Sequence, residues 1–302
     1  MNLKLLLAGL LAAGTASAAV MTGPSAAGGA YTFNPTLVTS YTNYGALATG
    51  VVFVDGVEGS DSTGTGSPSA PFRTLLKGQT TATNGMTVYG TRGTFAESDL
   101  GKPGIGWYFN DGVYLAGNPN FRLGTNGVTN LTVAGACTVT NNIVIFDDVT
   151  NCVASVTAKN YTGGANTAVS CNKGTSNTFY LNVDQFTGTL FSSLDEYSGV
   201  TYSNRTSRVV LTGRQRLTVN PAASASGNTN IFVYISAPEV WANGNGWGGT
   251  LNSVHLQADW FSRNGKTLTS IQSNYWFKGV SFLTTNDCNT NLPLRGTWYL
   301  ER

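Results

Sequence analysis

The chain is a long succession of very short β-type runs. From residue 51 onward, runs of three to five residues rich in Val, Ile, Thr and aromatic side chains recur, each bounded by Gly, Asn or Asp. Only Leu75–Gln79 in this part has the pattern of one helical turn. Many short strands fit either a parallel β-helix or a sandwich with Greek-key links. The runs are Val51–Val54, Met86–Tyr89, Val113–Leu115, Leu131–Val133, Ile143–Phe146, Thr178–Leu181, Val209–Leu211, Leu217–Val219 and Ile231–Ile235.

Charge content favours the β-helix. Only 11% of the 302 residues are charged, against about 25% in ordinary soluble domains, and 37 residues are Gly. A β-helix needs tight turns and disfavours like charges stacked at the ~4.8 Å strand spacing. The same figures exclude a coiled coil and a disordered tail, and a net charge of +2 gives no basic face for nucleic acid. We therefore predict an all-β chain that forms a single-stranded parallel β-helix.

The segment Val51–Phe95 carries a more specific order of turn and core residues. It resembles the opening coil of right-handed parallel β-helix proteins, which include secreted carbohydrate-active enzymes and bacteriophage tailspikes and fibres. The similarity covers about one seventh of the chain. The residues that carry it are Gly59-Ser60-Asp61, Gly66, Pro71-Phe72-Arg73-Thr74-Leu75, Met86-Thr87-Val88-Tyr89 and Gly93-Thr94-Phe95.

This resemblance implies a right-handed helix whose first coil closes one end of the core. Phe72 and Leu75 are expected to plug that end, because an open end would expose strand edges that recruit other chains. The chain departs from the family pattern at two places. Thr80–Asn84 is expected to nearly erase the short helix, and Gly90 replaces a β-branched residue.

Four regions are expected along the chain. Residues 1–18 are typical of an export signal, with Lys4 before the apolar Leu5–Gly14 and a small-residue cleavage site after it. The alternative is an uncleaved apolar assembly segment, which would be the only membrane contact. Residues 19–50 read as a linker or arm, 51–220 as the parallel β-helix, and 221–302 as a Trp-rich C-terminal cap or small β domain.

The four cysteines are compatible with two states. Their even number, together with an export signal, permits disulfides. Their spacing lacks any C-x-x-C pair, which argues against zinc. The commoner state of such residues is a buried, small apolar side chain in the core. They are Cys137, Cys152, Cys171 and Cys288.

Carboxylates are the first place to look for catalysis, since polysaccharide hydrolases need an acid and a base about 5 to 10 Å apart. Glu97 and Asp99 would share a strand face, whereas Asp147 and Asp148 would point apart unless a turn lies there. These four are weak catalytic candidates. The sole histidine, His255, alternates with apolar residues and is expected to be structural.

Calcium is the one metal that the sequence suggests, and only weakly. Asp55, Glu58 and Asp61 lie close together in the first turn region and could supply oxygen ligands. Lyases with this fold bind calcium on another face of the helix, so the resemblance does not support a catalytic ion here. No cofactor is expected otherwise.

Tryptophan is concentrated near the C-terminus, where five of the six lie. Aromatic faces on strands and loops bind sugars, so we expect a carbohydrate-binding surface there. The alternative is that these side chains close the end of the helix or pack in a subunit interface. The candidate sugar-binding residues are Trp241, Trp247, Trp260 and Trp276.

Two functions are in competition. The first is a non-enzymatic structural or receptor-binding protein: a phage tail fibre, spike or capsid-decoration subunit, or a surface adhesin that contacts glycans. It would self-associate, as a homotrimer or with other virion or surface subunits, and would be found on a virion or outside the cell. The alternative is a secreted polysaccharide lyase or hydrolase. The small number of carboxylates favours the first.

Overall fold

A computed structural model gives the architecture of the chain. It describes residues 50–118, 120–124, 127–172, 174–194, 205–225, 229–244 and 253–264, and the backbone of the strands at 275–278, 280–282 and 298–300. Residues 1–49, which include the predicted export segment and nearly all of the predicted arm, lie outside the described residues.

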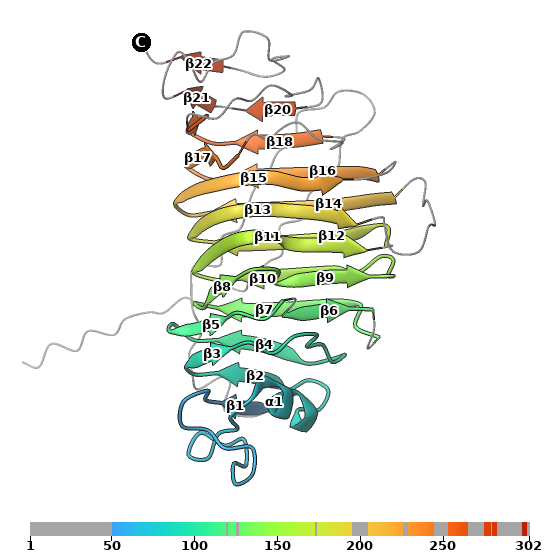
Figure 1. The fold of residues 1–302 in the computed structure, drawn as a ribbon, viewed down its shortest axis with the longest axis vertical. Helices are drawn as coiled ribbons and strands as arrows, with labels where there is room; N and C mark the ends of the chain where they lie inside the picture. The colour runs from blue at the N-terminus through green and yellow to red at the C-terminus, as the bar shows by residue number, and fades with distance from the viewer. Residues whose placement is uncertain are drawn as a thin grey trace, which may run out of the picture.

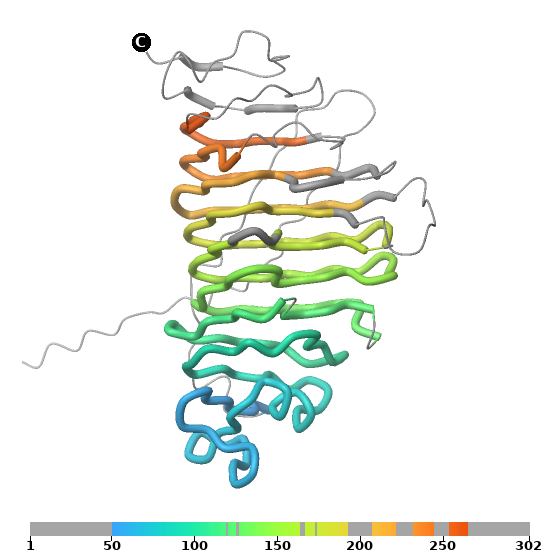
Figure 2. The backbone as a smooth tube through the Cα atoms, in the orientation of Figure 1, coloured from blue at the N-terminus to red at the C-terminus, as the bar shows by residue number. Residues whose placement is uncertain are grey.

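The chain forms a right-handed parallel β-helix, which confirms the predicted fold class. Coil follows coil along one axis, from the N-terminal end in blue to the C-terminal end in orange (Figures 1 and 2). Every pairing between the described strands is parallel, as stacked coils require. One ten-stranded sheet contains, in order, β1 (Val51–Val54), β2 (Thr87–Gly90), β4 (Gly106–Phe109), β7 (Asn130–Gly135), β10 (Val153–Thr157), β12 (Asn177–Val183), β14 (Arg205–Gly213), β16 (Thr229–Ser236), β18 (Ser253–Gln257) and β20 (Tyr275–Lys278).

The second sheet has twelve strands and bends, so that it covers two faces of the helix. In β11, the first residues pair with β8 and Val169–Asn172 pair with β9, so one strand serves two faces of the helix. We call the face that carries β8 the middle face. Its strands, in order, are β3 (Gly93–Phe95), β5 (Val113–Leu115), β8 (Thr138–Thr140), β11 (Asn160–Asn172), β13 (Gln185–Leu194), β15 (Arg216–Ala225), β17 (Glu239–Ala242), β19 (Trp260–Ser262), β21 (Val280–Phe282) and β22 (Trp298–Leu300); β6 (Phe121–Leu123) and β9 (Val144–Asp147) lie on the third face.

A column of stacked side chains fills the interior behind the middle face. Each strand of this face from β3 to β19 contributes one buried residue to this column, and the register places it directly against its counterpart on the next coil. Full burial of one such side chain stabilises the fold by roughly 1.5–3 kcal/mol. In each strand, the residues directly before and after the buried one point outward and form the surface. The buried column is Phe95, Leu115, Val139, Tyr161, Phe186, Leu217, Val240 and Phe261.

The N-terminal end of the core is closed as the resemblance implied. Phe72 and Leu75 are both buried in the main apolar cluster, and Phe72 forms a bridge to Val54. The helix α1 (Leu75–Thr81) lies against β1 and β2. Its Gly78 lets the helix approach the Val54 side chain, since a Cβ there would come within 2.7 Å of Val54 Cγ2.

The expectation that Thr80–Asn84 nearly erases this helix is wrong, because α1 continues to Thr81. Two side chains account for this. The Thr74 side chain accepts a hydrogen bond from the Lys77 N–H at the helix start. The Thr80 hydroxyl donates to the Leu76 carbonyl on the preceding turn, so its polar group is satisfied inside the helix.

The predicted boundary at residue 220 marks no break in either sheet. β14 pairs with β16, and β15 with β17, in the same parallel register as the coils before them. Both sheets then continue to the last strands, β20 and β22. The tryptophan-rich region therefore adds further coils to the helix in the part of the chain that the structure describes.

Candidate functional site

Asp99 and Asp147, two of the weak catalytic candidates, are held by one arginine. Arg122 Nε lies 2.6 Å from Asp99 Oδ1, and its Nη1 lies 2.5 Å from Asp147 Oδ2. The three residues come from successive coils and form a stack of alternating charge. Both carboxylates are thus engaged by the guanidinium, which lies between them where a hydrolase would hold the glycosidic bond.

The other two catalytic candidates lie elsewhere. Glu97 Oε1 accepts a hydrogen bond of 2.7 Å from the Leu75 N–H at the start of α1, so Glu97 caps that helix. Asp148 adopts a left-handed backbone conformation, with φ of 55°. The chain therefore turns at Asp148, directly after β9, and the Asp148 side chain is exposed.

The weak calcium candidates form two separate structural groups. Asp55 Oδ1 accepts hydrogen bonds from the Val57 and Glu58 N–H groups, and Arg92 makes ion pairs with both Asp55 and Glu58. Asp61 instead accepts from the N–H groups and hydroxyl just before α1. Among the described residues, no three His, Cys, Asp or Glu side chains are grouped as metal ligands.

His255 lies on the outer side of the ten-stranded sheet, stacked on Tyr234. The two ring centres are 4.8 Å apart and nearly parallel. Burial lowers the pKa of His255 to about 4, so the imidazole is neutral at physiological pH.

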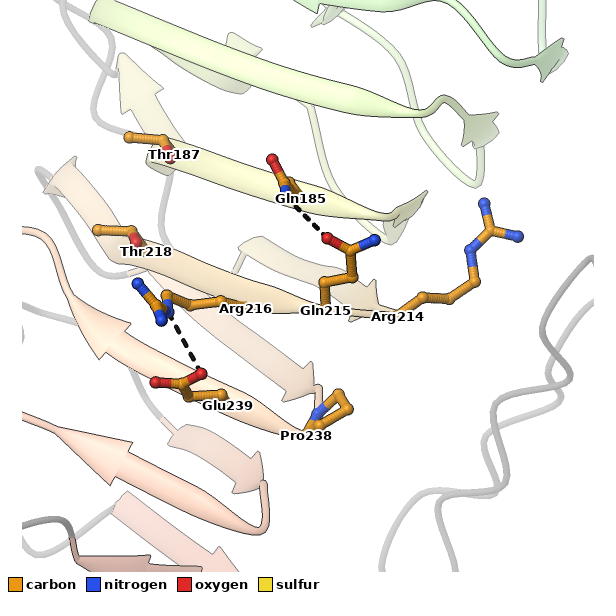
Figure 3. A pocket seen from close by; sticks show the side chains of 8 residues that line it. All are labelled: Gln185, Thr187, Arg214, Gln215, Arg216, Thr218, Pro238 and Glu239. Atoms are coloured by element: carbon orange, nitrogen blue, oxygen red, sulfur yellow. Dashed lines mark hydrogen bonds and ion pairs between the residues drawn. The ribbon is translucent and has the colours of Figure 1, made fainter.

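A groove on the middle face is lined by described residues from three successive coils (Figure 3). Its volume is about 580 Å³, and three successive strands, β13, β15 and β17, with the turns before them supply its lining. The lining residues stand at equivalent outward positions, since Thr187 pairs with Thr218 and Arg216 with Glu239. They are Gln185, Thr187, Arg214, Gln215, Arg216, Thr218, Pro238 and Glu239.

The charged groups of the groove are paired. Arg216 Nε lies 3.2 Å from Glu239 Oε2 (Figure 3). Arg214 points the other way and makes an ion pair with Asp184. Gln185 donates a 2.7 Å hydrogen bond to Gln215, which leaves further amide donors and acceptors at the mouth of the groove.

Trp241 borders this groove and is fixed by two of its lining residues. The indole N–H donates a 2.5 Å hydrogen bond to Glu239 Oε1, and the Arg216 guanidinium carbon lies 4.2 Å from the centre of the ring. Trp241 is half-buried. These two contacts fix the orientation of the indole ring beside a polar groove.

The four sugar-binding candidates have different outcomes. Trp241 borders the groove, and Trp260, also half-buried, lies on the next strand opposite Glu239. The side chain of Trp276 and all of Trp247 lie outside the described residues. The polar lining was missed, because Gln185, Arg216 and Glu239 are far apart in sequence and carry no motif.

Comparison of the chain with family models, with curated proteins and with solved structures finds no match in any of the three. No described helix is long and apolar enough to cross a membrane.

Proposed function

We propose that this chain is a non-enzymatic β-helix protein that binds glycans in the groove beside Trp241. The observation that supports this most strongly is the junction of an oriented indole with a groove lined by amide, hydroxyl and charged groups. Sugar rings present C–H faces that pack on aromatic rings and hydroxyls that bond to such polar groups.

The wider role in this proposal is that of a surface-exposed binding protein. We place it on a virion, as a tail fibre, spike or decoration subunit, or outside the cell as an adhesin. Self-association as a homotrimer belongs to the same proposal. Its supports are the export-type sequence of residues 1–18 and the tailspike-like order of Val51–Phe95.

The non-enzymatic part of the proposal is supported by the carboxylates. Asp99 and Asp147 share Arg122, and Glu97 caps α1. A secreted polysaccharide lyase or hydrolase remains the alternative outcome of the test below.

The test is a glycan-array screen followed by calorimetry on the purified chain. We expect Trp241→Ala to weaken binding of the selected glycan by roughly 5- to 10-fold, the scale of one aromatic contact. Tyr114→Ala is the matched control, because Tyr114 is exposed on the same face several coils away. Equal losses in both variants, or release of unsaturated or reducing ends from the glycan, would overturn the proposal.

A further inference from the structure

The charges of the groove allow the glycan class to be narrowed, provided that the proposed function holds. Arg214 faces Asp184, and Arg216 faces Glu239, so each arginine is matched by a carboxylate. Glu239 in turn binds the Trp241 indole N–H. An acidic sugar would have to compete with these carboxylates for the guanidinium groups, at a cost in desolvation and repulsion.

An uncharged sugar meets no such competition. The sugar hydroxyls can hydrogen-bond to the outer amides of Gln185 and Gln215 and to the hydroxyls of Thr187 and Thr218. The C–H faces of the sugar can pack on the indole ring of Trp241. A matched ion pair also presents polar edges without net charge, which suits neutral hydroxyls.

The shape of the groove also indicates the direction in which a bound glycan would lie. Its lining comes from β13, β15 and β17 at equivalent register positions, so the groove crosses the strands and runs along the helix axis. Trp260 continues this line on β19, where it pairs with Glu239. Successive strands are ~4.8 Å apart, which is about the length of one pyranose unit.

We propose that the groove takes an uncharged, linear oligosaccharide that lies along the helix axis, from Gln185 past Trp241 to Trp260. Each successive sugar then meets a side chain from the next coil. A disaccharide lies over β15 and β17, with one unit beside Trp241, and chains of three or more units reach Trp260 on β19.

The first experiment tests charge. Isothermal titration compares a neutral oligosaccharide with one of equal length that carries carboxylates, on wild type and Glu239→Gln. The glutamine keeps an acceptor for the Trp241 indole but leaves Arg216 uncompensated. We expect wild type to prefer the neutral chain, and Glu239→Gln to gain roughly two- to fivefold for the acidic one. Wild-type preference for the acidic chain, or no gain in the variant, overturns the charge inference.

The second experiment tests direction. A ladder of neutral oligosaccharides from two to six units is titrated into wild type, Trp260→Ala and the control Tyr114→Ala. We expect affinity to rise with length in wild type, and Trp260→Ala to lose roughly 3- to 10-fold for the long chains only. Length-independent affinity, or an equal loss for the disaccharide, overturns the axial placement. If no glycan binds at all, the proposed function fails instead.

Discussion

At the scale of the residue, several of the described charges lie in stacks of alternating sign. Arg92 joins Asp55 and Glu58, Arg122 joins Asp99 and Asp147, and the groove repeats the pattern. Repulsion between stacked like charges explains why the chain has few charged residues, but it does not explain how the charges that are present are accommodated. The charges in these stacks are tolerated because a partner of opposite sign lies on a nearby coil or turn.

Asp55 makes acid stability a testable property of the first turn. Burial alone would raise its pKa, but the Glu58 N–H, the Arg92 guanidinium and the Val57 N–H hold the pKa below its usual value. A carboxyl with a lowered pKa stabilises the fold above the unfolded pKa, near 4, and this contribution is lost as pH falls through the folded pKa.

We therefore expect Asp55→Asn to lower the free energy of unfolding by about 1–3 kcal/mol at pH 7 and by much less at pH 3. Urea denaturation at the two pH values measures this. Asp148→Asn is the control, because Asp148 is exposed and asparagine accepts its left-handed conformation. The same loss in both variants, or a loss independent of pH, would show that the Asp55 contacts are unimportant.

Glycine is required at position 135 because the backbones of two neighbouring coils approach each other closely there. The φ of Gly135 is 141°, and a Cβ there would lie 1.9 Å from the Phe109 carbonyl oxygen on the neighbouring coil. We expect Gly135→Ala to destabilise the chain by at least about 3 kcal/mol in urea denaturation. Gly112→Ala separates the two causes, since Gly112 has φ of 87° but open space around it, and should cost only about 1–2 kcal/mol. Equal costs would remove the contact with Phe109 as the reason.

At the scale of the element, α1 depends on side chains from outside it. Thr74 and Glu97 each accept a hydrogen bond from an N–H group in the first turn, and Asp61 holds Thr74 in place. Glu97 comes from the loop after β3, so the cap also ties the helix to the following coil.

The role of Glu97 can be separated from catalysis by two substitutions. Glu97→Ala leaves the Leu75 N–H without its partner and is expected to cost about 1 kcal/mol in thermal or urea unfolding. Glu97→Gln keeps an acceptor oxygen and should cost much less. A catalytic acid or base would show the opposite signature, namely an intact fold and lost turnover in Glu97→Gln.

The strands differ in how well their sequence predicts them. Val51–Val54 and Val113–Leu115 are strands with the predicted bounds, because turn residues flank each of them. The thirteen-residue β11 was not among the predicted runs. Gly163 and Gly164, residues typical of turns, lie within it where the register with β13 shifts between Thr162 and Thr167. Trp241 and Trp260 were candidates because tryptophan is concentrated near the C-terminus. Their polar neighbours depend on the register between coils, which no local pattern encodes.

At the scale of the whole molecule, the continuous apolar interior keeps the thiol groups of three cysteines away from solvent. The side chains of Cys137, Cys152 and Cys171 are buried thiols, as expected for small core side chains. Burial raises the pKa of Cys137 to about 12, so its reactive thiolate is scarce at neutral pH.

We expect these thiols to be inert in the native protein. In a Cys288→Ser variant, a thiol reagent at pH 8 should label none of the three within minutes, and all three after unfolding in guanidinium. Rapid labelling of any of them without denaturant would indicate that the core opens locally.

The axial groove has a consequence for how binding preferences can change. Because each coil contributes its own outward side chains while the interior column passes through unchanged, one coil is a unit that can be duplicated or exchanged. In the proposed binding mode, a graft of the outward residues of β15 or β17 would change the contacts to one sugar unit and leave the contacts to the others intact. Specificity of this kind would follow the order of the coils along the axis, and recombination between coils would change it one sugar unit at a time.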